Sequence, residues 1–94
     1  MKITRGTDNV FRDIGFDKAD AENLKLRSDL MIRIEKYVKQ SGMTQAEAAC
    51  ELGITQPRLN KLLKGKIQLF SLDALVNMLT NAGMRVTMSV KKAA

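Results

Sequence analysis

Residues 44–66, TQAEAACELGITQPRLNKLLKGK, decide the fold of this chain. The stretch begins with TQAE, the spacing of a capping box, in which a Thr hydroxyl and a Glu carboxylate each bond the other residue's backbone N–H. We expect a first short helix from there to Gly53. Thr55 is suited to cap a second helix, because Pro57 then falls in its first turn, where a missing N–H costs little. Gly65 is expected to end that helix.

The apolar residues of this stretch lie where two closely crossing helices need them. Small Ala49 falls on the inner face of the first helix, and Leu59 falls on the inner face of the second. Gly53 lies between them and tolerates the positive φ of a sharp turn. Further hydrophobic residues fill the surrounding positions: Ala48, Leu52, Ile54 and Leu62. All seven positions are in register, so the stretch predicts a helix-turn-helix.

The flanking sequence predicts three more elements. Residues 20–40 show the helical apolar period, and another amphipathic helix begins at Ser71 and ends at Gly83. The inner face of the first of these helices contains Leu24, Met31, Ile34 and Val38. Residues 84–90 alternate apolar and polar side chains, which is the period of a β-strand. A lone strand needs a partner, and either residues 2–5 or the same strand of a second molecule can supply it.

These elements predict a mainly α fold, a small helical bundle with a helix-turn-helix and a C-terminal β-strand. At 94 residues the chain has room for one compact domain. We divide it into an N-terminal extension (1–18), a helical helix-turn-helix domain (19–83) and a C-terminal strand (84–94) that is a candidate for dimerisation. Three apolar residues of the extension either cap the core or face a partner: Phe11, Ile14 and Phe16.

The composition excludes much catalytic chemistry. The chain has no His and one Cys, which excludes Ser-His and Cys-His pairs, His-ligated metals and zinc clusters. We expect no enzyme activity, no metal and no cofactor. We expect Cys50 to be a buried or half-buried apolar residue. The sequence also lacks a run of about 18 apolar residues and an apolar signal-peptide core, so we expect a cytosolic protein with no membrane partner.

The positive charge is concentrated in one place. The chain has 16 Lys and Arg residues against 10 Asp and Glu, a net charge of +6. No acidic residue occurs in residues 52–72, which contain Arg58, Lys61, Lys64 and Lys66. A solvated helix face is one explanation of such a run, but its coincidence with the second helix of the motif favours a polyanionic partner. The 4% aromatic content argues against an RNA-binding surface built on base stacking.

Residues 44–66 resemble the helix-turn-helix of the phage-repressor and Cro-like (XRE) regulators. The wider pattern, over residues 10–91, is similar to antitoxins of the HigA type: VFRDIGF, a first helix, this motif, FSLDALVNMLTNAG and a terminal strand. The resemblance implies a homodimeric repressor that binds double-stranded operator DNA. It also implies that the protein neutralises a small mRNA-cleaving toxin. A stand-alone repressor with no toxin partner is the alternative.

The resemblance directs attention to the second motif helix, because a helix that enters the major groove by its N-terminal end exposes its first two turns to base edges. Here that set is Thr55, Gln56, Pro57, Arg58 and Lys61. Gln56 can pair with adenine and Arg58 or Lys61 with guanine, whereas Pro57 offers only a van der Waals contact. We predict DNA-backbone contacts from Thr44, Gln45, Lys64 and Lys66. For Thr44, helix capping is a competing role.

Overall fold

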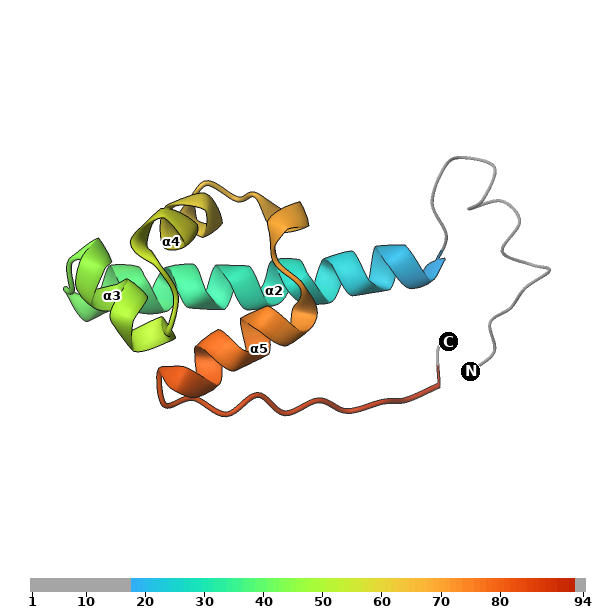
Figure 1. The fold of residues 1–94 in the computed structure, drawn as a ribbon. Coiled ribbons are helices and arrows are strands. Elements are labelled where there is room, and N and C mark those ends of the chain that lie inside the picture. Colours follow the sequence, from blue (N-terminus) through green and yellow to red (C-terminus); the bar gives the residue numbers. More distant parts are fainter. Residues whose placement is uncertain (1–17, 93–94) are drawn as a thin grey trace.

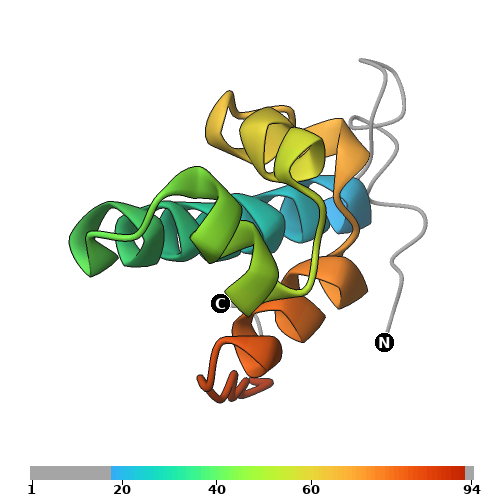
Figure 2. The same ribbon diagram turned by 60° about the vertical axis from the view of Figure 1, so that its left-hand side comes forward.

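The computed structural model describes residues 18–92, and everything below refers to that range. Within it, four α-helices and one short 3₁₀-helix follow one another in this order: α2 (Lys18–Ser41), α3 (Gln45–Leu52), α4 (Gln56–Leu63), η2 (Ile67–Leu69) and α5 (Leu72–Asn81). The long helix α2 contacts α4, η2 and α5, and α3 contacts α4 and α5. In both Figure 1 and Figure 2, α4 and α5 lie to either side of α2. The predicted helical bundle with a helix-turn-helix is confirmed.

A single hydrophobic core holds the helices together. Six of its side chains are completely or almost completely buried: Ile34, Leu52, Leu59, Phe70, Leu75 and Leu79. Small Ala48 and Ala49 are also buried, at 0% and 3% exposure, which lets α3 approach its neighbours closely. Phe70 and Leu75 are buried on the two sides of the start of α5, at the positions of a hydrophobic staple. The core therefore fixes the relative positions of α3, α4 and α5.

Two residues that we expected in the core lie on the surface. Leu24 is 41% exposed, because the N-terminal turns of α2 extend beyond α5 (Figure 1), and the buried face of the helix begins only at Met31. Cys50 is also exposed. It lies one residue beyond the inner face of α3, which is formed by Ala48, Ala49 and Leu52, so the helical rotation of about 100° per residue turns it outward.

The predicted helix boundaries are confirmed by capping interactions. The backbone N–H of Glu47 donates to the Thr44 hydroxyl (3.1 Å), and the Thr44 N–H donates to the Glu47 carboxylate (2.9 Å), so the capping box is complete. The Thr55 hydroxyl accepts from the Arg58 N–H at the start of α4. The Ser71 hydroxyl caps α5 in the same way. These caps satisfy helix-end amides that would otherwise need water.

The predicted C-terminal β-strand is not supported. Residues 84–92 form an extended segment that runs back past α5 (Figure 1), and no part of residues 18–92 forms a strand. The alternation does predict which side chains face the core, since Met84 and Val86 pack against it while Arg85 and Thr87 are exposed. What the segment lacks is a neighbouring strand among the described residues. Residues 2–5, one of the two partners we considered, lie outside that range, as do Phe11, Ile14 and Phe16.

The turn between α3 and α4 is fixed by two features at once. Gly53 adopts the left-handed conformation at φ 75° and ends α3. Asn81, at the end of α5, donates a side-chain hydrogen bond to the carbonyl of Leu52 (3.1 Å). A Cβ atom at position 53 would collide with the Asn81 amide nitrogen. Glycine is therefore needed here both for its conformation and for the space it leaves.

We predict that Gly53→Ala lowers the free energy of unfolding by about 2 to 3 kcal/mol. About 1 to 2 kcal/mol comes from the left-handed conformation and about 1 kcal/mol from displacing Asn81. Gly65→Ala is the matched control, because Gly65 has φ 79° but nothing within 4 Å of the added atom. Thermal unfolding followed by circular dichroism measures both. An equal loss of stability in the two variants would show that the Asn81 contact contributes nothing.

Candidate nucleic-acid interface

One side of α4 is buried and the other side is open to solvent. Leu59 and Leu62, at 0% and 2% exposure, hold the helix against the core. The exposed side chains of the helix and its end are Gln56, Pro57, Asn60, Lys61 and Lys64. Pro57, Lys61 and Lys64 follow the i, i+4, i+7 spacing of a single helical face, and this face lies opposite Leu59. The surface that α4 presents therefore begins with Gln56 and Pro57 and becomes cationic toward its C-terminal end, at Lys61 and Lys64.

The N-terminal end of α3 exposes the two residues predicted to contact the DNA backbone. Both Thr44 and Gln45 are exposed. The Thr44 oxygen accepts a hydrogen bond in the capping box, but a hydroxyl also carries one donor. Capping and donation to a phosphate are thus compatible roles for Thr44. Thr55 resembles Thr44 in both respects: its hydroxyl caps the start of α4, and the residue is exposed to solvent.

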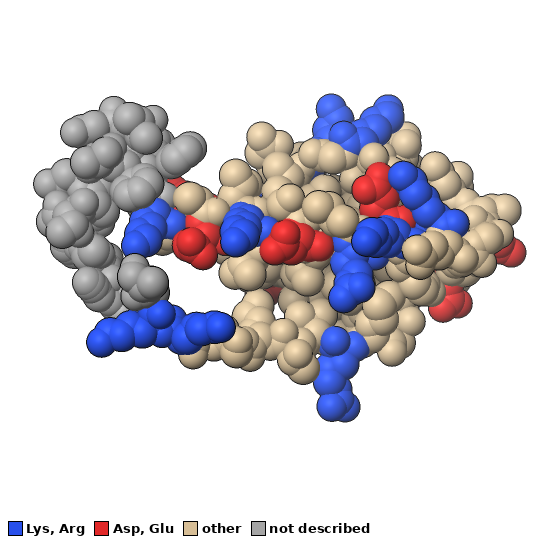
Figure 3. Space-filling view, turned by 180° about the vertical axis from the view of Figure 1, so that it is seen from behind, with Lys and Arg blue, Asp and Glu red and all other residues tan. Residues whose placement is uncertain are grey.

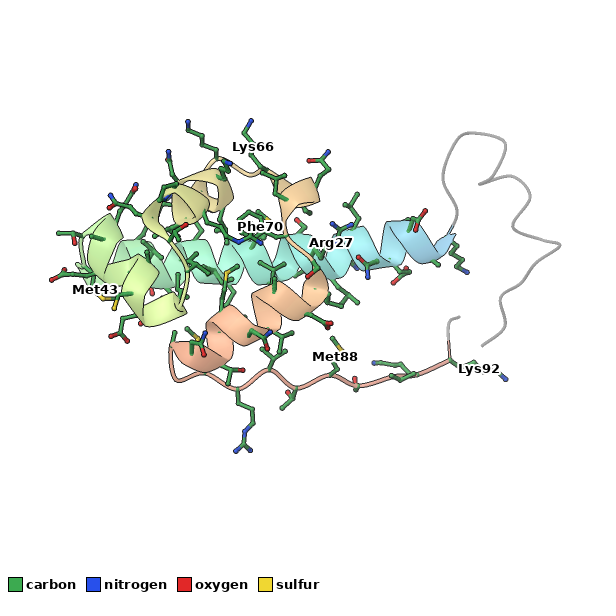
Figure 4. The ribbon with its side chains drawn as sticks, in the orientation of Figure 1. Arg27, Met43, Lys66, Phe70, Met88 and Lys92 are labelled. Carbon is green, nitrogen blue, oxygen red and sulfur yellow. The ribbon has the colours of Figure 1, made fainter. Side chains whose placement is uncertain are left out.

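A lysine cluster continues the surface beyond the end of α4. Lys61, Lys64 and Lys66 are exposed, and in the described part of the chain none of them is paired with a carboxylate. Lys66 points away from the body of the molecule above α4 (Figure 4). Seen from behind, Lys and Arg side chains gather at this edge, whereas along the middle of that face they alternate with Asp and Glu (Figure 3). Alternating charges are typical of a solvated helix face, whereas a cluster of lysines without acidic neighbours is not.

Arg58 is placed differently from the other predicted contacts. It is half-buried on the flank of α4, where one guanidinium nitrogen donates to the carbonyl of Leu69 (3.2 Å). The guanidinium carbon lies 4.5 Å from the centre of the Phe70 ring, within the range of a cation–π contact of about 0.5 to 2 kcal/mol. The outward face of α4, formed by Pro57, Lys61 and Lys64, therefore does not include Arg58.

Comparison with known proteins agrees with this geometry. A family model described as a helix-turn-helix domain matches residues 10–91. The chain belongs to this helix-turn-helix domain family. A solved structure described as a putative XRE family transcriptional regulator is similar, with a TM-score of 0.72 and 28% sequence identity over 79% of this chain and 83% of that one. No curated protein gives a significant sequence match. None of the helices in residues 18–92 is long and apolar enough to span a membrane.

Sequence reasoning missed two residues of this helix-turn-helix domain. Asn60 was absent from the predicted contacts, yet it is exposed beside Lys61 and Lys64 on the open side of α4. In the sequence, Asn60 lies two residues after Arg58, between the inward-facing and outward-facing positions of the helix. This position was the only indication that its side chain is exposed. Asn81 was missed because it acts across 29 residues of sequence, on the carbonyl of Leu52. It keeps the turn between α3 and α4 in place and so sets how α4 is presented.

Proposed function

We propose that this protein is a sequence-specific DNA-binding transcriptional regulator that inserts α4 into the major groove. The proposal rests on the solvent-exposed, cationic face of α4. On the other side of this helix, Leu59 and Leu62 are buried in the core. A major groove about 12 Å wide admits a helix of this kind, and the exposed residues at its N-terminal end then meet base edges. The family match and the XRE-family structural neighbour support this function.

Each exposed residue has a chemical role in this proposal. Gln56 and Asn60 have the amide geometry that pairs with adenine, and Lys61 can donate to guanine O6 and N7. Pro57 offers an apolar surface to a thymine methyl group. The backbone contacts come from both ends of the motif: Thr44, Gln45, Lys64 and Lys66. Thr55 caps α4 and lies beside the groove.

We predict that Lys61→Ala weakens binding to the operator by about 5- to 150-fold and relaxes the preference at one base pair. The lysine side chain lies on the outward face of α4, so its loss removes a contact without disturbing the core. Fluorescence anisotropy with a labelled operator and its single-base variants gives both quantities. Lys36→Ala is the matched control, because Lys36 is an exposed lysine of α2. Unchanged affinity for Lys61→Ala would show that another face contacts the DNA.

The proposal includes a homodimer on a palindromic operator. Two copies of α4 then enter successive major grooves about 34 Å apart, one turn of the DNA. The extended segment 84–92 supports this arrangement, because Met88 and Val90 are 57% and 96% exposed and alternate with polar residues. Pairing with the same segment of a second copy would supply the neighbour that the predicted strand lacks within the described residues.

We further propose that the protein is the antitoxin of a HigA-like toxin–antitoxin pair, with stand-alone repression as the alternative. The resemblance over residues 10–91 supports it. The exposed apolar side chains on α2 also favour a protein partner, since Leu24, Leu26 and Ile32 are 41%, 41% and 50% exposed. In this proposal the toxin contacts the N-terminal extension, residues 1–18, and the outer face of α2.

Co-expression tests the antitoxin role. This role predicts that the adjacent gene encodes a small basic toxin, and that the intact chain restores growth to cells that express it; an isolated gene would count against the role. Leu24→Glu should lose this rescue and keep operator binding, because Leu24 is exposed. It belongs to the N-terminal turns of α2, and that end of the helix lies away from α3 (Figure 1). Growth arrest that persists with the intact chain would leave the stand-alone repressor as the function.

A further inference from the structure

The loop after α4 is held by two arginines that come from different helices. Arg27 of α2 donates from one guanidinium nitrogen to the carbonyls of Ile67 (3.2 Å) and Phe70 (3.4 Å). Arg58 of α4 donates to the carbonyl of Leu69 (3.2 Å). The carbonyl groups of Ile67, Leu69 and Phe70 therefore accept hydrogen bonds from arginine side chains. A guanidinium group suits this role, because its N–H donors have a fixed planar geometry.

Phe70 lies at the centre of this arrangement. Its side chain is 1% exposed, and the Arg58 guanidinium covers the ring at 4.5 Å. The Phe70 carbonyl accepts from Arg27, whose Nε also donates to Asn23 (2.7 Å). Figure 4 shows the half-buried Arg27 near Phe70, while Lys66 points outward above them. The two guanidinium groups thus hold η2 from two neighbouring helices, α2 and α4.

The position of η2 determines where Lys66 lies. Lys66 directly precedes η2, and its carbonyl accepts from the Leu69 N–H (3.1 Å). Its own N–H donates to the carbonyl of Lys61 (3.2 Å), which ties the loop back to α4. A displacement of η2 would therefore disturb the backbone of Lys66, which is bonded to η2 on one side and to α4 on the other. Removing either arginine should loosen this segment, because η2 has only three residues and no side-chain cap.

We propose that Arg58 and Arg27 are positioning residues, which hold η2 so that Lys66 contacts the DNA backbone, and that Arg58 contacts no base. This inference rests on the proposed DNA-binding function and deepens it. It assigns base recognition to the outward residues Gln56, Asn60 and Lys61. It also gives Arg27, a residue of α2 outside the helix-turn-helix, an effect on DNA affinity that requires no DNA contact of its own.

The salt dependence of operator binding distinguishes positioning from general loss of stability. The slope of log affinity against log salt counts neutralised phosphates, so Lys66→Ala should reduce its magnitude by about 1 per chain. We expect Arg27→Met and Arg58→Met to reduce it by a similar amount. In a chain that already contains Lys66→Ala, neither Arg27→Met nor Arg58→Met should reduce the magnitude of the slope further. Arg33→Met is the control, since it removes the charge of an exposed arginine from the same helix as Arg27.

A base-substitution scan of the operator tests the second part of the inference. We expect Arg58→Met to weaken binding by the same factor on every operator variant. A loss of discrimination at one base pair, by about 5- to 150-fold, would show that Arg58 contacts a base and would overturn the inference. An unchanged salt slope for Arg27→Met would overturn it as well. Circular dichroism confirms that each variant is folded, and Arg27→Lys replaces Arg27→Met if the latter unfolds, because one ammonium group lacks the guanidinium fork.

Measuring DNA binding by the unmodified chain first distinguishes a failure of the proposed function from a failure of the positioning role. If it binds operator and scrambled DNA equally, the proposed function fails and this inference fails with it. If it discriminates between them and Arg27→Met behaves like Arg33→Met, the positioning role alone is wrong.

Discussion

Affinity for operator DNA is expected to fall by about 10³- to 10⁵-fold between 50 and 200 mM salt. Each neutralised phosphate contributes a slope of about −0.9 in log affinity against log salt, because it releases bound counterions. Lys64 and Lys66 on each of two chains give about four such contacts, and one phosphate at the N-terminal end of each α3, beside Thr44 and Gln45, brings the number to about six. Anisotropy titrations at four or five salt concentrations measure the slope directly.

The same experiment reports the number of chains on the DNA. A single chain with about three phosphate contacts would lose only about 40-fold over this range, since its slope is half as steep. A slope of −1 or shallower would contradict the cationic surface described for α4 and the loop after it. The Lys36→Ala variant should keep the full slope, because the charges along α2 alternate in sign (Figure 3).

The helix-turn-helix could be predicted from the sequence because its determinants are local. Thr44 and Glu47 form the capping box at the expected spacing, and Gly53 adopts the left-handed conformation expected of it. Ala49 and Leu59 are buried as the pattern indicates. Each of these features depends on residues within a few positions of one another, where helical periodicity and capping rules are strong.

What could not be predicted depends on contacts between distant segments. The pattern of residues 84–90 indicates an extended backbone but not the presence of a neighbouring strand, and the described chain supplies none. The placement of Arg58 is a second example, because its position in the second helix predicts a fully exposed side chain. Its half-burial depends on Leu69 and Phe70, which are brought beside it by the loop. Leu24 was misplaced because periodicity gives the face of a helix but not where the core ends. Cys50 was misplaced because it lies one residue beyond the buried face of α3.

The second large effect that we expect is discrimination between DNA sequences. Dimeric regulators that place a helix in each of two major grooves bind their own site about 10³- to 10⁷-fold more tightly than unrelated DNA. Phosphate contacts contribute equally to both, so this ratio arises from the residues that meet base edges. We propose that in this protein they are the exposed residues Gln56, Asn60 and Lys61, with Pro57 against a methyl group. Three or four such contacts on each of two half-sites are sufficient for a ratio at the lower end of that range or above.

The most direct test of the account is a titration of the purified chain against two duplexes of equal length at about 150 mM salt. One duplex contains the DNA upstream of the protein's own gene, and the other contains the same bases in scrambled order. We predict a dissociation constant at least about 10³-fold lower for the upstream sequence, with two chains bound per palindrome. Equal affinity for the two duplexes would contradict the claim that α4 recognises a DNA sequence.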